Sequence, residues 1–125
     1  MQTSVQSYRD LVAWQKSMKF VAHVYRSTRI FPKYELYRLA SQLRRSAISV
    51  PSNVAEGQGR RSTAEFRQFL GVARGSLLEA ETQILLAAEL GYLKLDESED
   101  LLRESSEVAR IINGLLNSLV GDHRN

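Results

Sequence analysis

The residues best suited to bind a charged ligand are arginines clustered in the first half of the chain. Two adjacent pairs, Arg44-Arg45 and Arg60-Arg61, flank one dense polar segment. Arginine presents a planar fork of N–H donors that fits the oxygen atoms of a phosphate group. We therefore predict phosphate contacts from six basic side chains: Lys33, Arg38, Arg44, Arg45, Arg60 and Arg61.

A polar stripe at helical spacing runs through the same segment. Its members are Arg38, Gln42, Arg45, Ser49, Ser52 and Glu56. Such a stripe is typical of a nucleic-acid-binding face, of ion pairing with an acidic neighbour, or of a solvated helix surface, and the residue types leave these alternatives open. Glu56, which lies among arginines, is more typical of an ion-pair partner than of a general base.

Motifs for catalysis or metal binding are absent from the sequence. The chain has no cysteine, and its histidines, His23 and His123, lack the preceding glutamate of the Glu-x-x-His motif of di-iron bundles. Residues 57–62 lack the spacing of a phosphate-binding P-loop, and no serine has the flanking glycines of a nucleophile elbow. We therefore expect no enzyme activity, no metal and no cofactor.

Charge differs strongly between the two halves of the chain. Residues 1–61 carry a formal charge of +8, whereas residues 62–125 carry −5, with the acids densest in residues 96–107. This asymmetry indicates either a surface for a polyanion or two surfaces that attract each other in an assembly. A protein whose helices simply differ in charge is an equally simple interpretation.

The elements that position these residues are predicted to be four helices. The first begins at Asp10 as N-cap and ends at Phe31-Pro32, and the second spans residues 34–57 with a kink at Pro51. The predicted core-facing residues of the first are Leu11, Trp14, Met18, Val21, Tyr25 and Thr28. Those of the second are Leu36, Leu39, Leu43, Ala47, Val50 and Val54.

The second half of the chain predicts two further helices. The third opens with a capping box, Ser62 and Glu65, and ends at Gly91, while the fourth spans residues 96–121. The predicted core-facing residues of the third are Phe66, Phe69, Ala73, Leu77, Ala80, Ile84 and Ala87. Those of the fourth are Leu101, Ser105, Val108, Ile112, Leu115 and Leu119. Short connections between long helices favour an antiparallel bundle.

Two features of the later helices favour self-association. The fourth helix has apolar residues beyond a single core-facing stripe: Leu102, Ala109, Ile111, Leu116 and Val120. Gly71 and Gly75 lie one turn apart, where another backbone could approach, either from within the monomer or from a second chain. An apolar face of that width usually meets a partner, so we expect an oligomer.

The length of the chain and its hydropathy indicate the number of domains and the cellular location that we expect. A chain of 125 residues fits a single domain over residues 1–125. No apolar run approaches the roughly 20 residues of a membrane span, and residues 1–7 do not resemble a signal peptide. We expect a cytoplasmic protein without membrane contact.

A series of short motifs along residues 8–119 resembles one protein family. The motifs are Asp10-Leu11, Trp14-Gln15-Lys16, Phe31-Pro32-Lys33, Glu35, Tyr37, Arg44-Arg45-Ser46-Ala47, Pro51-Ser52-Asn53-Val54-Ala55-Glu56-Gly57, Gly59-Arg60, Glu65-Phe66, Phe69-Leu70, Gly75-Ser76-Leu77, Glu79, Glu81-Thr82-Gln83 and Leu90-Gly91-Tyr92. Together they resemble the four-helix bundle proteins encoded in intervening sequences of bacterial 23S ribosomal RNA.

The resemblance implies an up-and-down four-helix bundle that assembles into a barrel-like homopentamer without enzyme activity. It also implies similarity in fold to accessory variability proteins of diversity-generating retroelements, which are basic pentamers that bind nucleic acid and a reverse transcriptase. Two hypotheses follow. The protein is a non-enzymatic oligomer that binds RNA or DNA, or it is an assembly or adaptor subunit, such as an accessory partner of a reverse transcriptase.

Overall fold

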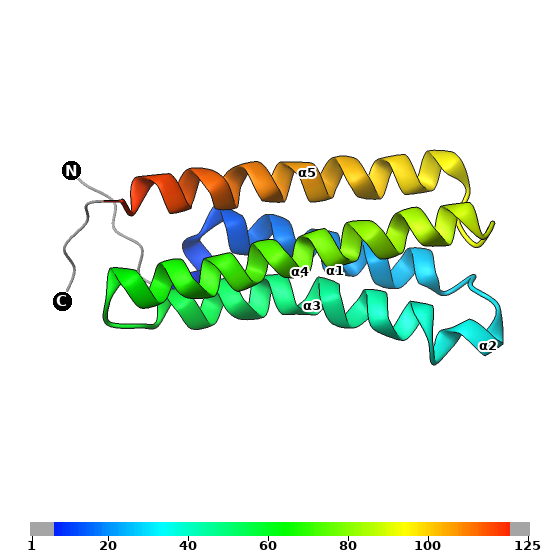
Figure 1. The fold of residues 1–125 in the computed structure, drawn as a ribbon, viewed down its shortest axis with the longest axis horizontal. Helices are drawn as coiled ribbons and strands as arrows, with labels where there is room; N and C mark the ends of the chain where they lie inside the picture. Colours follow the sequence, from blue (N-terminus) through cyan, green and yellow to red (C-terminus); the bar gives the residue numbers. More distant parts are fainter. Residues whose placement is uncertain (1–6, 121–125) are drawn as a thin grey trace.

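Apolar residues at helical spacing form four long helices in residues 7–120, the part of the chain that the computed structural model describes (Figure 1). The elements are a short 3-10 turn η1 (Tyr8–Asp10), then α1 (Val12–Thr28), α2 (Lys33–Leu36), α3 (Leu39–Gln58), α4 (Thr63–Glu89) and α5 (Leu95–Ser118). No strand occurs within these residues. The prediction of an all-α bundle is therefore confirmed.

The four long helices run alternately up and down around one core (Figure 1). Helix α1 packs against α3 and α5, and α4 packs against the same two helices. The helices therefore form a four-sided arrangement in which α3 and α5 occupy opposite corners. Fully buried side chains from each long helix, including Phe20, Leu43, Leu77 and Ile112, fill the centre.

Local capping explains where α4 begins and ends. The Ser62 hydroxyl accepts a hydrogen bond from the Glu65 amide at 3.1 Å, as predicted from the sequence. At the other end, Gly91 has a φ of +81°, a conformation that glycine adopts without strain. The Tyr92 amide donates to the Ala87 carbonyl and the Gly91 amide to Ala88, which is the bond pattern of a Schellman motif.

Two predictions about the helices, the N-cap of the first and the unbroken course of the second, are wrong. Asp10 does not cap α1, because it ends the η1 turn, where its carboxylate accepts the Ser7 amide at 3.2 Å. The predicted helix over residues 34–57 is interrupted between α2 and α3, where Arg38 has non-helical dihedral angles. Tertiary contacts hold this break, since the Glu35 carboxylate accepts a hydrogen bond from the Tyr92 hydroxyl at 2.8 Å. Helix α3 itself continues through Pro51.

The core-facing stripe predicted for α1 is only partly right. The buried residues of this helix are Ala13, Ser17, Phe20, Val24, Ser27 and Thr28. Of the predicted stripe, Thr28 is fully buried and Met18 and Tyr25 are exposed, while three residues are partly buried against the core: Leu11, Trp14 and Val21. The fully buried stripe includes three hydroxyl residues, Ser17, Ser27 and Thr28, and a search for apolar residues at helical spacing overlooks serine. The hydroxyls of Ser17 and Thr28 donate to carbonyls of their own helix, as Thr28 does to Val24 at 2.8 Å, and the Ser27 hydroxyl donates to the Glu97 carboxylate of α5. These bonds reduce the cost of burial.

The stripes predicted for the other helices fit the structure, but the interpretation of the wide face on α5 does not. Leu116 belongs to the core, and Leu102, Ala109 and Ile111 pack against it, so most of that face is covered within the monomer. Only Val120 of this group is strongly exposed. Exposed apolar side chains occur on several helices, and four of them lie on the outer surface of α4, in a group that we name the α4 ridge: Val72, Leu78, Leu85 and Leu86.

Gly71 and Gly75 lie on the same outer side of α4. A Cβ atom added to either would meet no other atom within 4 Å, so neither glycine serves packing inside the monomer. Among residues 7–120, no helix is both long and apolar enough to cross a membrane.

Candidate nucleic-acid interface

A polar groove of about 730 Å³ runs along the seam between α3 and α4. Its walls are formed by Tyr37, Arg38, Ser41, Gln42, Arg45, Ser46, Ser49, Ser76, Glu79 and Gln83. Four members of the predicted polar stripe, Arg38, Gln42, Arg45 and Ser49, therefore share one surface. We call this surface the α3–α4 groove.

Hydroxyl and amide groups line the deeper part of the α3–α4 groove. The hydroxyls of Ser49 and Ser76 lie 2.7 Å apart, and the Asn53 amide donates to Ser49. The buried side-chain oxygen of Gln83 has no hydrogen-bond partner among the described residues.

An exposed tyrosine stands beside the arginines of this groove. The side chain of Tyr37 is 91% exposed, because it lies at the break between α2 and α3. An exposed ring next to Arg38 and Arg45 combines a stacking surface with phosphate-binding groups. Single-stranded nucleic acid is bound by this combination, because bases stack on aromatic rings while cations contact the backbone.

The two adjacent arginines of α3 have different environments. The Arg44 guanidinium is partly buried against α1, with its Nε 2.7 Å from the Thr28 hydroxyl and its Cζ 4.8 Å from the Tyr25 ring centroid. Arg45 is exposed and borders the groove. Arg44 therefore connects α1 to α3, whereas Arg45 keeps its donors available to a ligand.

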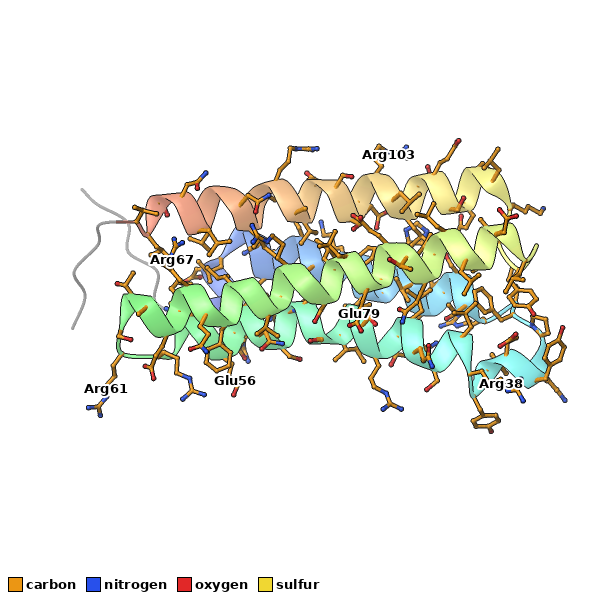
Figure 2. The ribbon with its side chains drawn as sticks, in the orientation of Figure 1. Arg38, Glu56, Arg61, Arg67, Glu79 and Arg103 are labelled. Carbon is orange, nitrogen blue, oxygen red and sulfur yellow. The ribbon has the colours of Figure 1, made fainter. Side chains whose placement is uncertain are left out.

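The remaining predicted residues lie at opposite ends of the bundle. Lys33 begins α2, and Arg60 and Arg61 lie in the loop between α3 and α4 (Figure 2 labels Arg38 and Arg61). Helix α3 has 20 residues and so separates these groups by about 30 Å. Arg60 pairs with Glu56 at 3.2 Å and covers the Phe69 ring, which confirms Glu56 as an ion-pair partner. The six residues therefore do not form one compact site.

The helix arrangement keeps the acidic helix away from the arginines of the groove. Helix α5 packs against α1 and α4, and its Glu107 pairs with Lys16 of α1 at 3.3 Å. Because α3 occupies the opposite corner, the acids of α5 neutralise α1 rather than Arg38 or Arg45. Ion pairs between the basic first half and the acidic second half of the sequence therefore form partly within the monomer, where α1 meets α5 and away from the α3–α4 groove.

His23 contributes to this pairing rather than to a reactive centre. Its Nδ1 lies 2.7 Å from Glu104 and its Nε2 lies 3.0 Å from Glu97, whose carboxylate also accepts the Ser27 hydroxyl. The carboxylates contact opposite nitrogens of the ring, so they do not converge on one metal position. The serine bonds to the carboxylate and not to the imidazole, which differs from a catalytic triad. Hydrogen bonds from Ser27 and then His23 lower the pKa of Glu97.

Sequence reasoning missed six residues of the α3–α4 groove: Tyr37, Ser41, Ser46, Ser76, Glu79 and Gln83. Tyr37 lay inside a predicted continuous helix, so its exposure was hidden until the break was known. Glu79 and Gln83 come from α4, and only the packing of α4 beside α3 brings them to the arginines (Glu79 in Figure 2). One sequence signal could have identified Tyr37, because an aromatic residue stands there directly before the basic residue Arg38.

Comparison with known protein families shows to which family this chain belongs. Residues 9–114 match the model of the 23S rRNA-intervening sequence protein family. The chain belongs to this family. The resemblance seen in the short motifs is therefore confirmed over most of the chain. No curated protein matches the sequence.

A solved structure supports the family fold. The bundle is similar to the crystal structure of a protein with unknown function from the S23 ribosomal protein family of Bacteroides thetaiotaomicron, with a TM-score of 0.79 and 20% identity. The similarity covers 85% of this chain and 96% of that chain. The two proteins therefore share the helical fold over nearly the whole of the solved chain.

Proposed function

We propose that this 23S rRNA-intervening sequence protein is a non-enzymatic, cytoplasmic, homo-oligomeric subunit that binds RNA through the α3–α4 groove. Arg38 and Arg45 contact backbone phosphates, and Tyr37 stacks on an unpaired base. We take RNA rather than DNA as the ligand because the unpaired bases and 2′-hydroxyls of RNA loops suit an exposed aromatic ring beside hydrogen-bonding groups. Lys33 and Arg61 extend the contacts toward the two ends of the bundle, where a long strand would reach them.

One observation carries this proposal. The 91% exposed Tyr37 ring and two exposed arginines border one groove that is lined by serine hydroxyls, amides and one carboxylate, Glu79, so that cations outnumber anions there. An isolated tyrosine with that exposure has no packing role, and helix α5 does not neutralise the arginines. Repetition of the groove around an oligomer would add weak contacts on one long polyanion, so that avidity supplies the affinity.

The proposal predicts different effects for the arginines and the tyrosine. Replacing both Arg38 and Arg45 by Ala should weaken RNA binding and reduce the slope of log K against log salt by about 1.4 to 1.8 per subunit, because two phosphates lose their counterion-releasing partners. Tyr37→Ala should weaken binding about fivefold to 100-fold per stacked base and leave the salt slope unchanged. Fluorescence anisotropy with single-stranded RNA, structured RNA and DNA at several salt concentrations measures both quantities.

Two control variants sharpen this experiment. Arg103→Ala removes one positive charge from the exposed side of α5 and should leave RNA affinity near that of the wild type (Figure 2). Arg44→Ala should reduce stability more than binding, since Arg44 connects two helices. Absence of binding by the intact wild type at low salt would refute RNA as the ligand, and tighter binding to DNA would refute the preference for RNA.

Protein-protein assembly is the second candidate function. The α4 ridge supports it, because each of its four side chains is 45% to 59% exposed within the monomer. A surface of this kind fits either self-association into the homopentamer expected of the family or docking of a protein such as a reverse transcriptase. Loss of partner binding in variants of the α4 ridge that keep the oligomer would support the adaptor role.

A further inference from the structure

A second basic pocket lies between α4 and α5, on the flank of α4 that faces away from α3. It has a volume of about 780 Å³. Its walls are formed by Ala64, Arg67, Gln68, Gly71, Arg74, Asn113, Leu116 and Asn117. None of these described residues is acidic. The pocket is therefore distinct from the α3–α4 groove in position, in residues and in charge.

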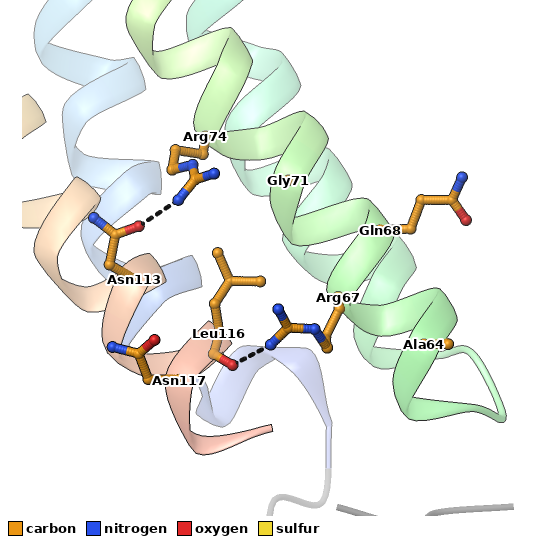
Figure 3. Close-up of a pocket in the computed structure, with 8 residues that line it drawn as sticks. All are labelled: Ala64, Arg67, Gln68, Gly71, Arg74, Asn113, Leu116 and Asn117. Atoms are coloured by element: carbon orange, nitrogen blue, oxygen red, sulfur yellow. Dashed lines mark hydrogen bonds between the residues drawn. The ribbon is translucent and has the colours of Figure 1, made fainter. Parts of the chain in front are cut away.

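Two guanidinium groups converge on this pocket from α4. Figure 3 shows Arg67 and Arg74 extending toward α5 on either side of Gly71, while Gln68 points away. The Arg67 guanidinium donates to the Leu116 carbonyl, and the Arg74 Nη1 donates to the Asn113 side-chain oxygen at 3.0 Å. Each guanidinium has five N–H donors and makes one hydrogen bond within the described residues, so most of its donors remain available.

The existing hydrogen bonds prepare the pocket for an anion. Because a guanidinium can only donate, Asn113 must turn its oxygen toward Arg74, which leaves its NH₂ group as a donor. Asn117 lies one turn further along α5 and adds a second amide. The contact of Arg67 with the Leu116 carbonyl offsets the partial negative charge at the end of α5, which would otherwise repel an anion.

The missing side chain of Gly71 keeps the pocket open. Gly71 lies between the two arginines, and a Cβ atom there would meet nothing within 4 Å. A larger residue at this position would fill the hollow without disturbing the core. Glycine in the middle of an exposed helix is less favourable than alanine, so neither helix propensity nor packing within the monomer explains its presence.

We propose that this pocket binds one phosphate group, held by Arg67 and Arg74 with amide donors from Asn113 and Asn117. Two guanidinium charges match a phosphate monoester, which carries a charge of about −1.5 to −2 at neutral pH, better than a phosphodiester. The ligand class is thus a terminal phosphate, such as that of a nucleotide or an oligonucleotide end. The site does not depend on the proposed RNA contacts of the α3–α4 groove.

Nuclear magnetic resonance titration of the intact protein tests this site. Inorganic phosphate and methyl phosphate should shift the side-chain amide signals of Asn113 and Asn117 in a saturable way, and dimethyl phosphate, a phosphodiester mimic, should bind several-fold more weakly. Sodium chloride at equal ionic strength should give no saturable shift. Arg74→Gln should lower the affinity for methyl phosphate about tenfold, because it removes a charged hydrogen-bond donor.

Three further variants distinguish the pocket from nonspecific charge effects. Gly71→Leu should abolish binding while circular dichroism and thermal unfolding show an intact fold, and Arg103→Gln should bind as the wild type does. The variant with Arg38 and Arg45 both replaced by Ala should keep phosphate binding, which separates this site from the α3–α4 groove. Saturable binding retained in Gly71→Leu, or none in the wild type, would overturn the proposal. Equal affinity for dimethyl phosphate would overturn its assignment to a terminal phosphate.

Discussion

Neighbouring arginines on α3 show how strongly the role of a side chain depends on its angle around the helix. Arg44 and Arg45 are identical in type and differ by about 100° in direction. One stacks on Tyr25 and bonds to Thr28, whereas the other borders the α3–α4 groove. A run of basic residues therefore does not predict that all its members face one ligand.

Two glycines also differ in their surroundings, and we predict that alanine substitutions at them change the free energy of unfolding in opposite directions. Gly57 is buried, and a Cβ atom there would lie 2.7 Å from the Phe69 Cβ, so Gly57→Ala should destabilise the bundle by about 1–3 kcal/mol. Gly75 faces open space in the monomer, so Gly75→Ala should add about 0.5–1 kcal/mol through helix propensity. Urea unfolding of both variants measures the two changes.

Each result has a clear contrary outcome. A Gly57→Ala variant as stable as the wild type would show that α3 and α4 can separate locally at no cost. A destabilised Gly75→Ala variant would show that this part of α4 closely contacts another chain.

At the level of helices, the contact between α1 and α5 predicts a dependence of stability on pH. Hydrogen bonds from Ser27 and His23 hold the pKa of Glu97 below its ordinary value of 4.5. A lowered pKa in the folded state adds stability above the pKa of the unfolded state, and this stability disappears as the pH falls through the folded value. Glu97→Gln should therefore cost stability at neutral pH and nothing in acid below the folded pKa.

The magnitude of this effect should be small. The Glu97 side chain is 36% exposed, so solvent screening limits the contribution to about 0.5 kcal/mol. Chemical denaturation of the wild type and of Glu97→Gln at neutral and acidic pH measures the difference. Ser27→Ala, which removes the largest cause of the shift, should reproduce much of the loss. An equal difference between wild type and Glu97→Gln at both pH values would contradict the assignment of the effect to the carboxylate charge.

For the whole molecule, the exposed α4 ridge predicts assembly. Leu78 and Leu85 are 59% and 56% exposed and lie two turns apart on one side of α4. Full burial of such a side chain contributes about 1.5–3 kcal/mol, and each of these leucines has roughly half of that gain left to make at an interface. Because a ring repeats the interface around its axis, we expect association to be stable at micromolar concentration. Light scattering after size exclusion should show a homo-oligomer, expected to be a pentamer of 14.2 kDa chains.

The double variant Leu78→Glu with Leu85→Glu should dissociate this oligomer and retain helical circular dichroism, because neither residue belongs to the core. Replacing Glu79 and Glu89, which are exposed on the same helix, by Gln serves as a control that should keep the assembly. A wild-type protein that runs as a monomer would contradict the role of the α4 ridge.

The sequence by itself determined the features that depend on one or two helical turns. The core-facing stripes of α3, α4 and α5 follow from apolar spacing, and the ends of α4 follow from Ser62 and Gly91, whose capping bonds reach only neighbouring residues. The arginines of the α3–α4 groove were also predictable, since Arg38, Gln42, Arg45 and Ser49 share one side of a helix by spacing alone.

Only the tertiary structure decided which surfaces meet. Helix α1 has two possible stripes, and its rotation is set by neighbouring helices that cover Ala13, Phe20 and Val24 and leave Met18 exposed. The break before α3 depends on Tyr92, which is distant in sequence. The proposed phosphate-binding pocket between α4 and α5 brings Arg67 and Arg74 close to Asn113, which is about 40 residues later in the sequence. Antiparallel packing makes this possible, because it places the start of α4 beside the end of α5. Periodicity describes one helix at a time, whereas rotation and neighbours are properties of the packed bundle.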